Sequence, residues 1–385
     1  MGPGRVYKPA KELTDMSKGK RLTSTVTSDS TVHLRIEEFK VPTPGPDEVL
    51  VAVEASPINP SDLGLLLAGA HPSTASKSGN GLTLSLPDSA IDALTARIDQ
   101  AMPVGNEGAG LVLDTGSEEQ AQALQGQVVA VLAGGMYATH RIVKARDCLV
   151  LEEGTQAIDA ASCFVNPLTA LGMTETMRLE GHSALIHTAA ASNLGQMLNR
   201  ICIDDDIDLV NIVRRDEQVE LLKSQGANYV VDSSSPNFAS ELVKAIAATG
   251  ATLGFDAIGG GELQTQILHA METAASSSDG EYSRYGSTTH KQLYIYGGLD
   301  RGPTQLIRNY GMAWGIGGWL LPNFLAKIGI ERSQELRTRV ATELTTTFAS
   351  SYSHKLSLES VLDVDSMSLY AQMSTQGKSL VCPQL

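Results

Sequence analysis

The sequence predicts an α/β protein of two domains: one mostly β, the other built on a doubly wound parallel sheet. The first observation is the length of 385 residues with 42% hydrophobic side chains, which suits two cores better than one. The second is a first third rich in short β-type runs punctuated by glycine. The third is a middle third in which strand-like and helix-like segments alternate, the pattern of a parallel sheet.

The first third contains one segment that interrupts the β pattern. Residues 72–101 are predicted to be an insertion, with a Ser- and Gly-rich loop over Pro72–Gly81 followed by a short helix. We expect this insertion to be a solvated decoration. The strands expected around it are Val49–Glu54, Gly110–Asp114 and Gln127–Leu132.

The middle third is expected to form the parallel sheet, and the chain then becomes helical again from about Glu331. A last strand, Lys378–Cys382, is expected to return to the first domain. The strands predicted for the sheet are Ala184–His187, Asp208–Val213, Tyr229–Val231, Thr252–Ala257 and Leu293–Tyr296. The helices predicted between them pass through Met197 and Ile201 and cover Glu217–Gln225 and Asn237–Ala247.

Composition argues against several classes of partner. A formal net charge of −14 disfavours nucleic acid and anionic lipid. The polar Met1–Arg21 stretch does not look like a secretory signal. Polar residues interrupt the apolar Gly311–Ile330 segment, so we expect a buried helix or an interface there rather than a membrane span. The cysteines form no CxxC pair, which fits a reducing, cytoplasmic setting: Cys148, Cys163, Cys202 and Cys382.

A turn of small residues, Ala189–Gly195, follows the first strand of the predicted sheet and opens a helix. Small side chains let backbone N–H groups approach a pyrophosphate, and the helix N-terminus adds partial positive charge. The turn is a degenerate glycine-rich motif in which only Gly195 survives, and ordinary strand–turn–helix packing gives the same pattern.

Two arginines, Arg214 and Arg215, follow the second strand of the sheet. In dinucleotide-binding folds the adenine ribose binds at this strand end. An acidic residue there would favour NAD, whereas two guanidinium groups suit the 2′-phosphate of NADPH. The alternative is a solvated pair in a loop. Glycines at other strand ends, Gly259 and Gly297–Gly298, support a ligand at this edge or serve plain turns.

Five motifs, taken in order, resemble the zinc-free branch of the medium-chain dehydrogenase/reductase superfamily, which contains quinone oxidoreductases and 2-enoyl thioester reductases. They are Ile58–Asp62, Pro103–Gly110, Val165–Ala170, Ser192–Gly195 and Tyr296–Leu299. The resemblance implies a GroES-like domain (1–165 and 330–385), a Rossmann domain (166–329) and an active site in the cleft between them. It also implies a set of NADPH contacts: Asn166, Thr169, Ala191, Ser192, Asn193, Leu194, Arg214, Arg215, Gly259, Tyr296, Gly297, Gly298, Leu299, Trp319 and Lys378. Trp319 could instead be core, and Lys378 a solvent-facing residue.

Zinc is not expected in this chain. The zinc-dependent members of the superfamily have a Cys near the position of Asn59 and a His where this chain has Asn106. Catalytic zinc needs thiolate or imidazole ligands, and neither is present at these positions. The substrate must then be polarised by hydrogen bonds or by a protonated side chain.

The proton donor is the least determined part of the site. The similar enoyl reductases carry a Tyr at the place where this chain has Ala70-His71. His71 and Tyr137 are candidate acids, and Asn59 is a third candidate catalytic residue. The alternatives are a solvated loop histidine and a packed strand aromatic.

The function expected from these features is NADPH-dependent hydride transfer to a small molecule with an activated double bond, or to a quinone. The alternative is a non-catalytic member of the same fold that binds NADPH as a sensor or structural ligand. By analogy with the family, we expect a homodimer.

Overall fold

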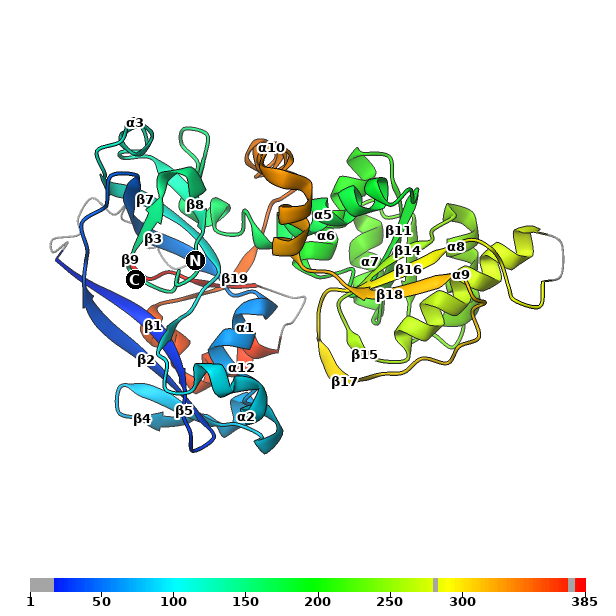
Figure 1. The fold of residues 1–385 in the computed structure, drawn as a ribbon, viewed down its shortest axis with the longest axis horizontal. Helices are drawn as coiled ribbons and strands as arrows, with labels where there is room; N and C mark the ends of the chain where they lie inside the picture. Colours follow the sequence, from blue (N-terminus) through cyan, green and yellow to red (C-terminus); the bar gives the residue numbers. More distant parts are fainter. Residues whose placement is uncertain (1–16, 280–282, 373–377) are drawn as a thin grey trace, which may run out of the picture. The chain divides into compact units, whose positions relative to one another are not determined.

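The computed structural model describes residues 17–279, 283–372 and 378–385 (Figure 1). The chain divides into two compact units: Met1–Val165 with Arg339–Leu385, here called unit 1, and Asn166–Thr338, here called unit 2. The first 16 residues, which include most of the polar N-terminal stretch, lie outside the described part.

Unit 1 is mostly β, as predicted, and contains two sheets. One has the strand order β4-β5-β2-β1-β6, and the other the order β10-β8-β7-β3-β20-β19 with β9 paired to β3. The predicted C-terminal strand is present as β20, which pairs antiparallel with β3 and parallel with β19. The strands of unit 1 are β1 (Lys18–Val26), β2 (Thr31–Lys40), β3 (Glu48–Pro57), β4 (Ser76–Ser78), β5 (Gly81–Ser85), β6 (Met102–Pro103), β7 (Glu107–Thr115), β8 (Val128–Leu132), β9 (His140–Lys144), β10 (Cys148–Val150), β19 (Tyr352–Leu356) and β20 (Lys378–Val381).

Short helices connect the strands of unit 1 and cover part of its core. Alpha-helical segments are α1 (Pro60–Leu67), α2 (Asp88–Leu94), α3 (Glu119–Gln122), α4 (Ala157–Ala160), α11 (Leu358–Val361) and α12 (Val364–Ala371). Single turns of 3-10 helix are η2 (Pro72–Thr74), η3 (Thr95–Arg97) and η4 (Ala145–Asp147).

The prediction of a solvated insertion at residues 72–101 was wrong for its middle part, from Gly81 to Leu86. Its helix is present as α2, but the segment also contributes β4 and β5, and β5 pairs with β2 along Leu82–Ser85. Leu82, Leu84 and Leu86 are buried in the same core as α1 and β1. Their alternation is the strand signal that the sequence contained.

Unit 2 contains a six-stranded, all-parallel sheet of order β13-β12-β11-β14-β16-β18, as the alternating pattern predicted (Figure 1). The order runs outward in both directions from β11, so the sheet is doubly wound. Strands β15 and β17 pair in parallel as a separate two-stranded sheet. The strands are β11 (Ala184–His187), β12 (Asp208–Val213), β13 (Tyr229–Asp232), β14 (Leu253–Asp256), β15 (Gly259–Gly261), β16 (Lys291–Ile295), β17 (Asp300–Thr304) and β18 (Trp314–Gly318).

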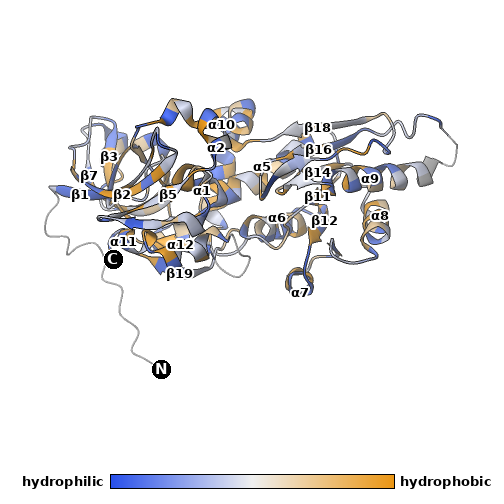
Figure 2. Cartoon of the chain, turned by 90° about the horizontal axis from the view of Figure 1, so that it is seen from below, coloured by the Kyte–Doolittle hydropathy of each residue, from blue (hydrophilic) through white to orange (hydrophobic). Residues whose placement is uncertain are grey.

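Helices cover both faces of the parallel sheet. Helices α8 and α9 lie on one face and α5 and α6 on the other (Figures 1 and 2). Apolar residues of α8 and α9, such as Leu242 and Ile267, are fully buried against strand residues such as Val210. The helices are α5 (Val165–Leu179), α6 (Asn193–Asp204), α7 (Asp216–Ser224), α8 (Phe238–Thr249), α9 (Leu263–Asp279) and α10 (Leu321–Thr342).

The apolar Gly311–Ile330 segment is not one buried helix, which was the first of the two predicted alternatives. Its first half forms the edge strand β18, and its second half begins α10, where Gly329 interrupts the helical backbone with φ 80°. Glycine at positions 315, 317 and 318 hid the strand, because glycine is rare in strand interiors. No helix among the described residues is long and apolar enough to span a membrane.

A buried ion pair holds α9 to β16 in unit 2. The Lys291 ammonium, with a fully buried side chain, lies 2.6 Å from Oε2 of Glu272. Ser287 donates to the same carboxylate from its backbone N and its hydroxyl, at 2.8 and 2.9 Å. A buried charge that loses its partner is costly, because no water replaces the lost contact.

Replacing Lys291 with Met should therefore destabilise unit 2. We expect a loss of about 3–5 kcal/mol in the free energy of unfolding, measured by urea denaturation. Lys244→Met, at an exposed position on α8, is the matched control and should cost under about 0.5 kcal/mol. Equal stability of the two variants would contradict the assignment.

The same pair predicts a dependence of stability on acid pH. Burial alone would raise the pKa of Glu272, but hydrogen bonds from Lys291, Ser287 and Ser276 outweigh it and lower the pKa from 4.5 to about 2. A depressed carboxyl pKa stabilises the fold above pH 4.5, and this stabilisation is lost as pH falls to about 2. The difference in unfolding free energy between wild type and Glu272→Gln should shrink over that interval; a constant difference would refute the assignment.

Candidate functional site

The candidate cofactor site lies at one edge of the parallel sheet of unit 2. Strands β11, β12, β14 and β16 run parallel, so their carboxyl ends meet at that edge. The strand order reverses between β11 and β14, and doubly wound sheets bind ligands outside such a switch point. The residues after these four strands are therefore brought together by topology.

The small-residue turn leads from β11 into α6. Ala189 adopts φ 50°, a left-handed conformation that is costly for any residue but glycine. Ser192 caps α6, with its Oγ accepting a hydrogen bond from the backbone N of Gly195 at 3.1 Å. Asn193 and Leu194 are the first helical residues, so the positive end of α6 faces the turn. This arrangement suits a bound phosphate.

Gly195 is the one position of the turn where close packing demands glycine. A Cβ added there would lie 2.2 Å from the carbonyl oxygen of Ala190, far inside van der Waals contact. Ala190 and Ala191 are themselves buried, at 0% and 1% exposure. The degenerate motif thus keeps its glycine where the helix crosses the preceding backbone.

Arg214 and Arg215 stand immediately after β12, next to β11 in the sheet. Both side chains are exposed, and neither guanidinium forms an ion pair within the described part of the chain. The backbone N of Arg214 donates to Oε1 of Gln218 at 3.2 Å, and Arg215 is the N-cap of α7. Two cations without carboxylate partners therefore sit at the place predicted for the adenine ribose.

A buried carboxylate, Asp256, organises the chain after β14. Its Oδ1 accepts hydrogen bonds from the Thr188 hydroxyl at 2.7 Å and from the backbone N of Ile258 at 3.0 Å. Its Oδ2 accepts from the backbone N of Gly259 at 2.9 Å and from Nε2 of Gln264 at 2.6 Å. Asp256 is completely buried, so these bonds fix the loop that carries Gly259 against the end of β11.

The segment after β16 is fixed to the same loop. The backbone N of Leu299 donates to the Ala257 carbonyl at 3.1 Å, and a Cβ on Gly297 would lie 2.7 Å from that oxygen. Strand β17 then pairs with β15, which begins at Gly259. The structure thus brings Gly259 together with Gly297, Gly298 and Leu299.

Tyr296 is held by a histidine that sequence reasoning missed. Its hydroxyl lies 2.8 Å from Nε2 of His187, the last residue of β11, and the two rings are stacked. Burial lowers the pKa of His187 to about 3, so the ring is neutral. Burial also raises the pKa of Tyr296. His187 and Tyr296 therefore form a fixed hydrogen bond between two uncharged side chains, at the carboxyl end of β11.

Three further predicted contacts lie on or against α5. Asn166 and Thr169 are buried on this helix, at 7% and 6% exposure. The Trp319 indole packs where a Cβ on Gly172 would lie, and its Nε1 donates to the Thr176 hydroxyl at 3.1 Å. These contacts fit the core alternative for Trp319, and its cofactor contact stays a prediction.

In unit 1 the buried carboxylate of Glu107 clamps Asn59. Nδ2 of Asn59 donates to Oε1 at 2.8 Å, while the backbone N atoms of Phe164 and Val165 donate to Oε2 at 2.8 and 3.0 Å. Glu107 is 0% exposed and Asn59 1% exposed. The geometry makes Asn59 a fixed partner of Glu107, and a direct catalytic role for it stays a prediction.

A second buried carboxylate, Asp62, lies one turn further along α1. It accepts hydrogen bonds from the backbone N atoms of Asn59 and Asn106, both at 2.8 Å. Burial outweighs these bonds and raises its pKa to about 7. Asp62 therefore changes protonation near neutral pH.

The two candidate acids from the sequence occupy unequal environments. His71 is exposed and caps η2, its Nδ1 lying 2.7 Å from Oγ of Ser73. Tyr137 is 0% exposed within the core of unit 1, where its hydroxyl donates to the Pro57 carbonyl at 3.1 Å. Burial raises the pKa of Tyr137 well above 10. These positions match the loop-histidine and packed-aromatic alternatives better than proton donation.

Lys378, at the start of β20, takes part in a polar chain within unit 1. Its Nζ donates to Oγ of Ser162 at 2.9 Å, and that oxygen lies 2.7 Å from the hydroxyl of Tyr352. Lys378 is partly buried, which differs from the solvent-facing alternative. Sequence reasoning gave no signal for Ser162 or Tyr352, because both are far from Lys378 in the chain.

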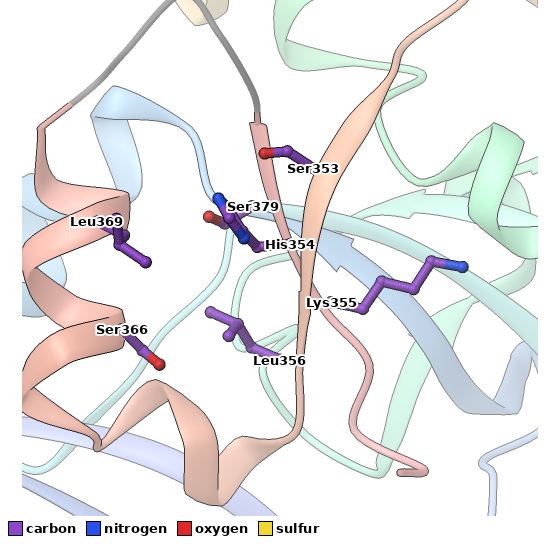
Figure 3. Close-up of a pocket in the computed structure, with 7 residues that line it drawn as sticks. All are labelled: Ser353, His354, Lys355, Leu356, Ser366, Leu369 and Ser379. Atoms are coloured by element: carbon purple, nitrogen blue, oxygen red, sulfur yellow. The ribbon is translucent and has the colours of Figure 1, made fainter. Parts of the chain in front are cut away.

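A small hollow also lies in unit 1 (Figure 3). Its volume is about 230 Å³, and it is lined by residues of β19 and α12 together with Ser379. None of the predicted site residues lines it. Among the described residues, no group of three or more His, Cys, Asp or Glu side chains is arranged to hold a metal ion.

Comparisons with known proteins agree with this architecture, although no protein-family model matches the sequence. The mitochondrial enoyl-[acyl-carrier-protein] reductase of Xenopus tropicalis is 27% identical over 208 residues, 51% of this chain and 51% of that protein. The chain thus spans about half the length of that relative. An NADPH quinone oxidoreductase of Kluyveromyces marxianus is 25% identical over 307 residues, 76% of this chain and 73% of that one.

A solved structure gives the same result for the fold. A Mesorhizobium loti protein assigned to the NADPH:quinone reductases superposes with a TM-score of 0.72 at 25% identity, covering 95% of this chain and 99% of that one. In sequence and fold the chain is thus similar to the quinone oxidoreductases and enoyl thioester reductases of the medium-chain dehydrogenase/reductase superfamily.

Gly195→Ala should disrupt the turn, because the added Cβ meets the Ala190 carbonyl at 2.2 Å. We expect a loss of about 2–4 kcal/mol in unfolding free energy, measured by urea denaturation. Gly64→Ala on α1 is the control, since its Cβ would meet no atom within 4 Å and alanine favours helix. An undestabilised Gly195→Ala variant would show that the turn is looser than described.

Proposed function

We propose that this chain is an NADPH-dependent reductase of a small molecule. The acceptor is an activated double bond, in an enoyl thioester or an α,β-unsaturated carbonyl, or a quinone. The names of its relatives, enoyl reductases and an NADPH quinone oxidoreductase, support this range. At identities of 25–27%, the choice among these acceptors is a matter for experiment.

The observation that carries the proposal is the arginine pair after β12, beside the turn before α6. The turn supplies backbone N–H groups and a helix N-terminus for a pyrophosphate. Arg214 and Arg215 supply two guanidinium groups, which can bind a 2′-phosphate with bidentate hydrogen bonds. NADPH carries both groups, whereas NADH lacks the 2′-phosphate, so these residues fit NADPH.

Bound NADPH supplies a hydride, and the protein supplies orientation and electrostatics. The loops fixed by Asp256 and the His187–Tyr296 hydrogen bond form a rigid edge against which a nicotinamide can be oriented. In unit 1, Asn59 donates a hydrogen bond to Glu107. The family resemblance implies that the zinc-dependent members have their zinc ligands near the position of Asn59 and at that of Asn106. Activation of the acceptor then falls to hydrogen bonds and a protonated side chain.

One observation favours a second candidate, a non-catalytic NADPH-binding protein. His71 is exposed and engaged with Ser73, and Tyr137 is buried and engaged with Pro57. These contacts match the loop-histidine and packed-aromatic alternatives for the two residues. A sensor or structural protein needs the cofactor residues and no acid.

Replacing both Arg214 and Arg215 with Ala should weaken NADPH binding by about 10- to 100-fold, or about 1.4–2.8 kcal/mol. NADH affinity should change less than about twofold, because NADH has no 2′-phosphate. Isothermal titration of the full chain with each nucleotide measures both affinities.

Lys223→Ala is the matched control for that titration, since Lys223 is an exposed cation on the adjoining helix α7. It should leave both affinities unchanged. An equal fall for NADPH and NADH in the double arginine variant would refute the assignment of the pair to the 2′-phosphate.

A further inference from the structure

The turn before α6 keeps its shape although only its last residue is a glycine. Ala189 has φ 50°, a left-handed conformation that is unfavourable for any residue but glycine. Ala190 and Ala191, which follow it, are buried at 0% and 1% exposure. A turn built from such residues needs contacts that hold its backbone, and the peptide group between Ala191 and Ser192 receives one at each end.

Gln196, near the start of α6, provides one of these contacts. Its Nε2 donates to the Ala191 carbonyl at 2.9 Å, and the backbone N of Ser192 donates to the Ala189 carbonyl, also at 2.9 Å. Because a peptide group is planar, hydrogen bonds at its carbonyl and at its N–H fix its orientation. This peptide leads directly into Ser192, the N-cap of α6. The Gln196 amide therefore helps to hold the N-terminus of α6, where a pyrophosphate would bind.

The Gln196 side chain is itself held by Gln225, which lies at the end of α7. Nε2 of Gln225 donates to Oε1 of Gln196 at 2.8 Å. The Ala191 carbonyl can only accept a hydrogen bond, so Gln196 must present Nε2 to that carbonyl and Oε1 to Gln225. The orientation of both amides follows from this one acceptor.

Two buried asparagines fix the backbone of Gln225. Nδ2 of Asn199 on α6 donates to the Gln225 carbonyl at 3.4 Å, and Oδ1 of Asn199 accepts from Nδ2 of Asn211 on β12 at 3.2 Å. Asn199 is 2% exposed and Asn211 1% exposed. Helix α7 begins after Arg215 and ends at Gln225, so the helix that follows the arginine pair is joined to α6 at its far end.

We propose that Gln196 is a positioning residue for the pyrophosphate of the cofactor, and that Gln225 acts through it. Gln196 holds the peptide between Ala191 and Ser192, and Gln225 holds the Gln196 amide. The inference rests on the proposed binding of NADPH, and all of these residues belong to unit 2. It explains how a turn with a single glycine keeps the geometry that a dinucleotide needs.

The first test is the variant Gln196→Met, which keeps the length of the side chain and removes its amide. Isothermal titration of the full chain uses three probes: NADPH, NADH and adenosine 2′-monophosphate, which has the 2′-phosphate and no pyrophosphate. The affinities for NADPH and NADH should each fall by about fivefold, since one hydrogen bond that holds the turn is lost. The affinity for adenosine 2′-monophosphate should change less than about twofold, because its phosphate is assigned to the arginine pair.

Gln225→Met should weaken the same two affinities and spare adenosine 2′-monophosphate. Because Gln225 acts through Gln196, the double variant should lose no more than about fivefold, whereas independent effects would multiply to about 25-fold. Gln266→Met, at an exposed position on α9, is the matched control and should leave all three affinities unchanged.

The pattern across the probes separates positioning from a general structural role. Equal losses for all three probes would mean that the amides only stabilise unit 2, and unchanged affinities for NADPH and NADH would mean that the turn does not need them; either result overturns the proposal. A multiplied loss in the double variant would overturn the role of Gln225. Binding with the expected pattern but without turnover of any acceptor would overturn the reductase and support the positioning role.

Discussion

A buried carboxylate must have hydrogen-bond donors in place of water. The candidate site depends on two such carboxylates. Glu107 in unit 1 and Asp256 in unit 2 are both completely buried. Glu107 accepts hydrogen bonds from Asn59 and from the start of α5, and Asp256 from Thr188 and the loop after β14. Each therefore fixes segments that are distant in sequence, because an unsatisfied buried charge would cost several kcal/mol.

The parallel sheet adds the second constraint, which is directional. The carboxyl ends of its strands lie at one edge of the sheet. The topology alone therefore brings together the segments that follow these strands, which are the turn before α6, the arginine pair, Gly259 and the Tyr296 segment. Function then depends on which side chains occupy the edge. In this chain they are small residues at the turn and cations after β12, the combination that suits a phosphorylated dinucleotide.

Patterns in the sequence were enough to predict the two-part fold, the parallel sheet of unit 2 with five of its six strands, and the places of Ser192, Arg214 and Gly195 at strand ends, because these follow from local periodicity and turn chemistry. The roles of Glu107 and Asp256 could not be predicted, since their partners lie 57 and 68 residues away in the chain. Nor could Ser162 be linked to Tyr352, 190 residues further on. The strand at Leu82–Ser85 was different: its alternation was visible, and the Ser- and Gly-rich neighbourhood masked it.

Oxidation of NADPH by the intact protein decides whether this chain reduces a small molecule, as proposed. The intact protein is mixed with NADPH and a panel of quinones, enals and enoyl thioesters, and oxidation of NADPH is followed by its absorbance. We expect turnover with at least one class of acceptor and a much slower reaction with NADH at the same concentration. Binding of NADPH without oxidation by any acceptor would contradict it and favour a non-catalytic NADPH-binding protein.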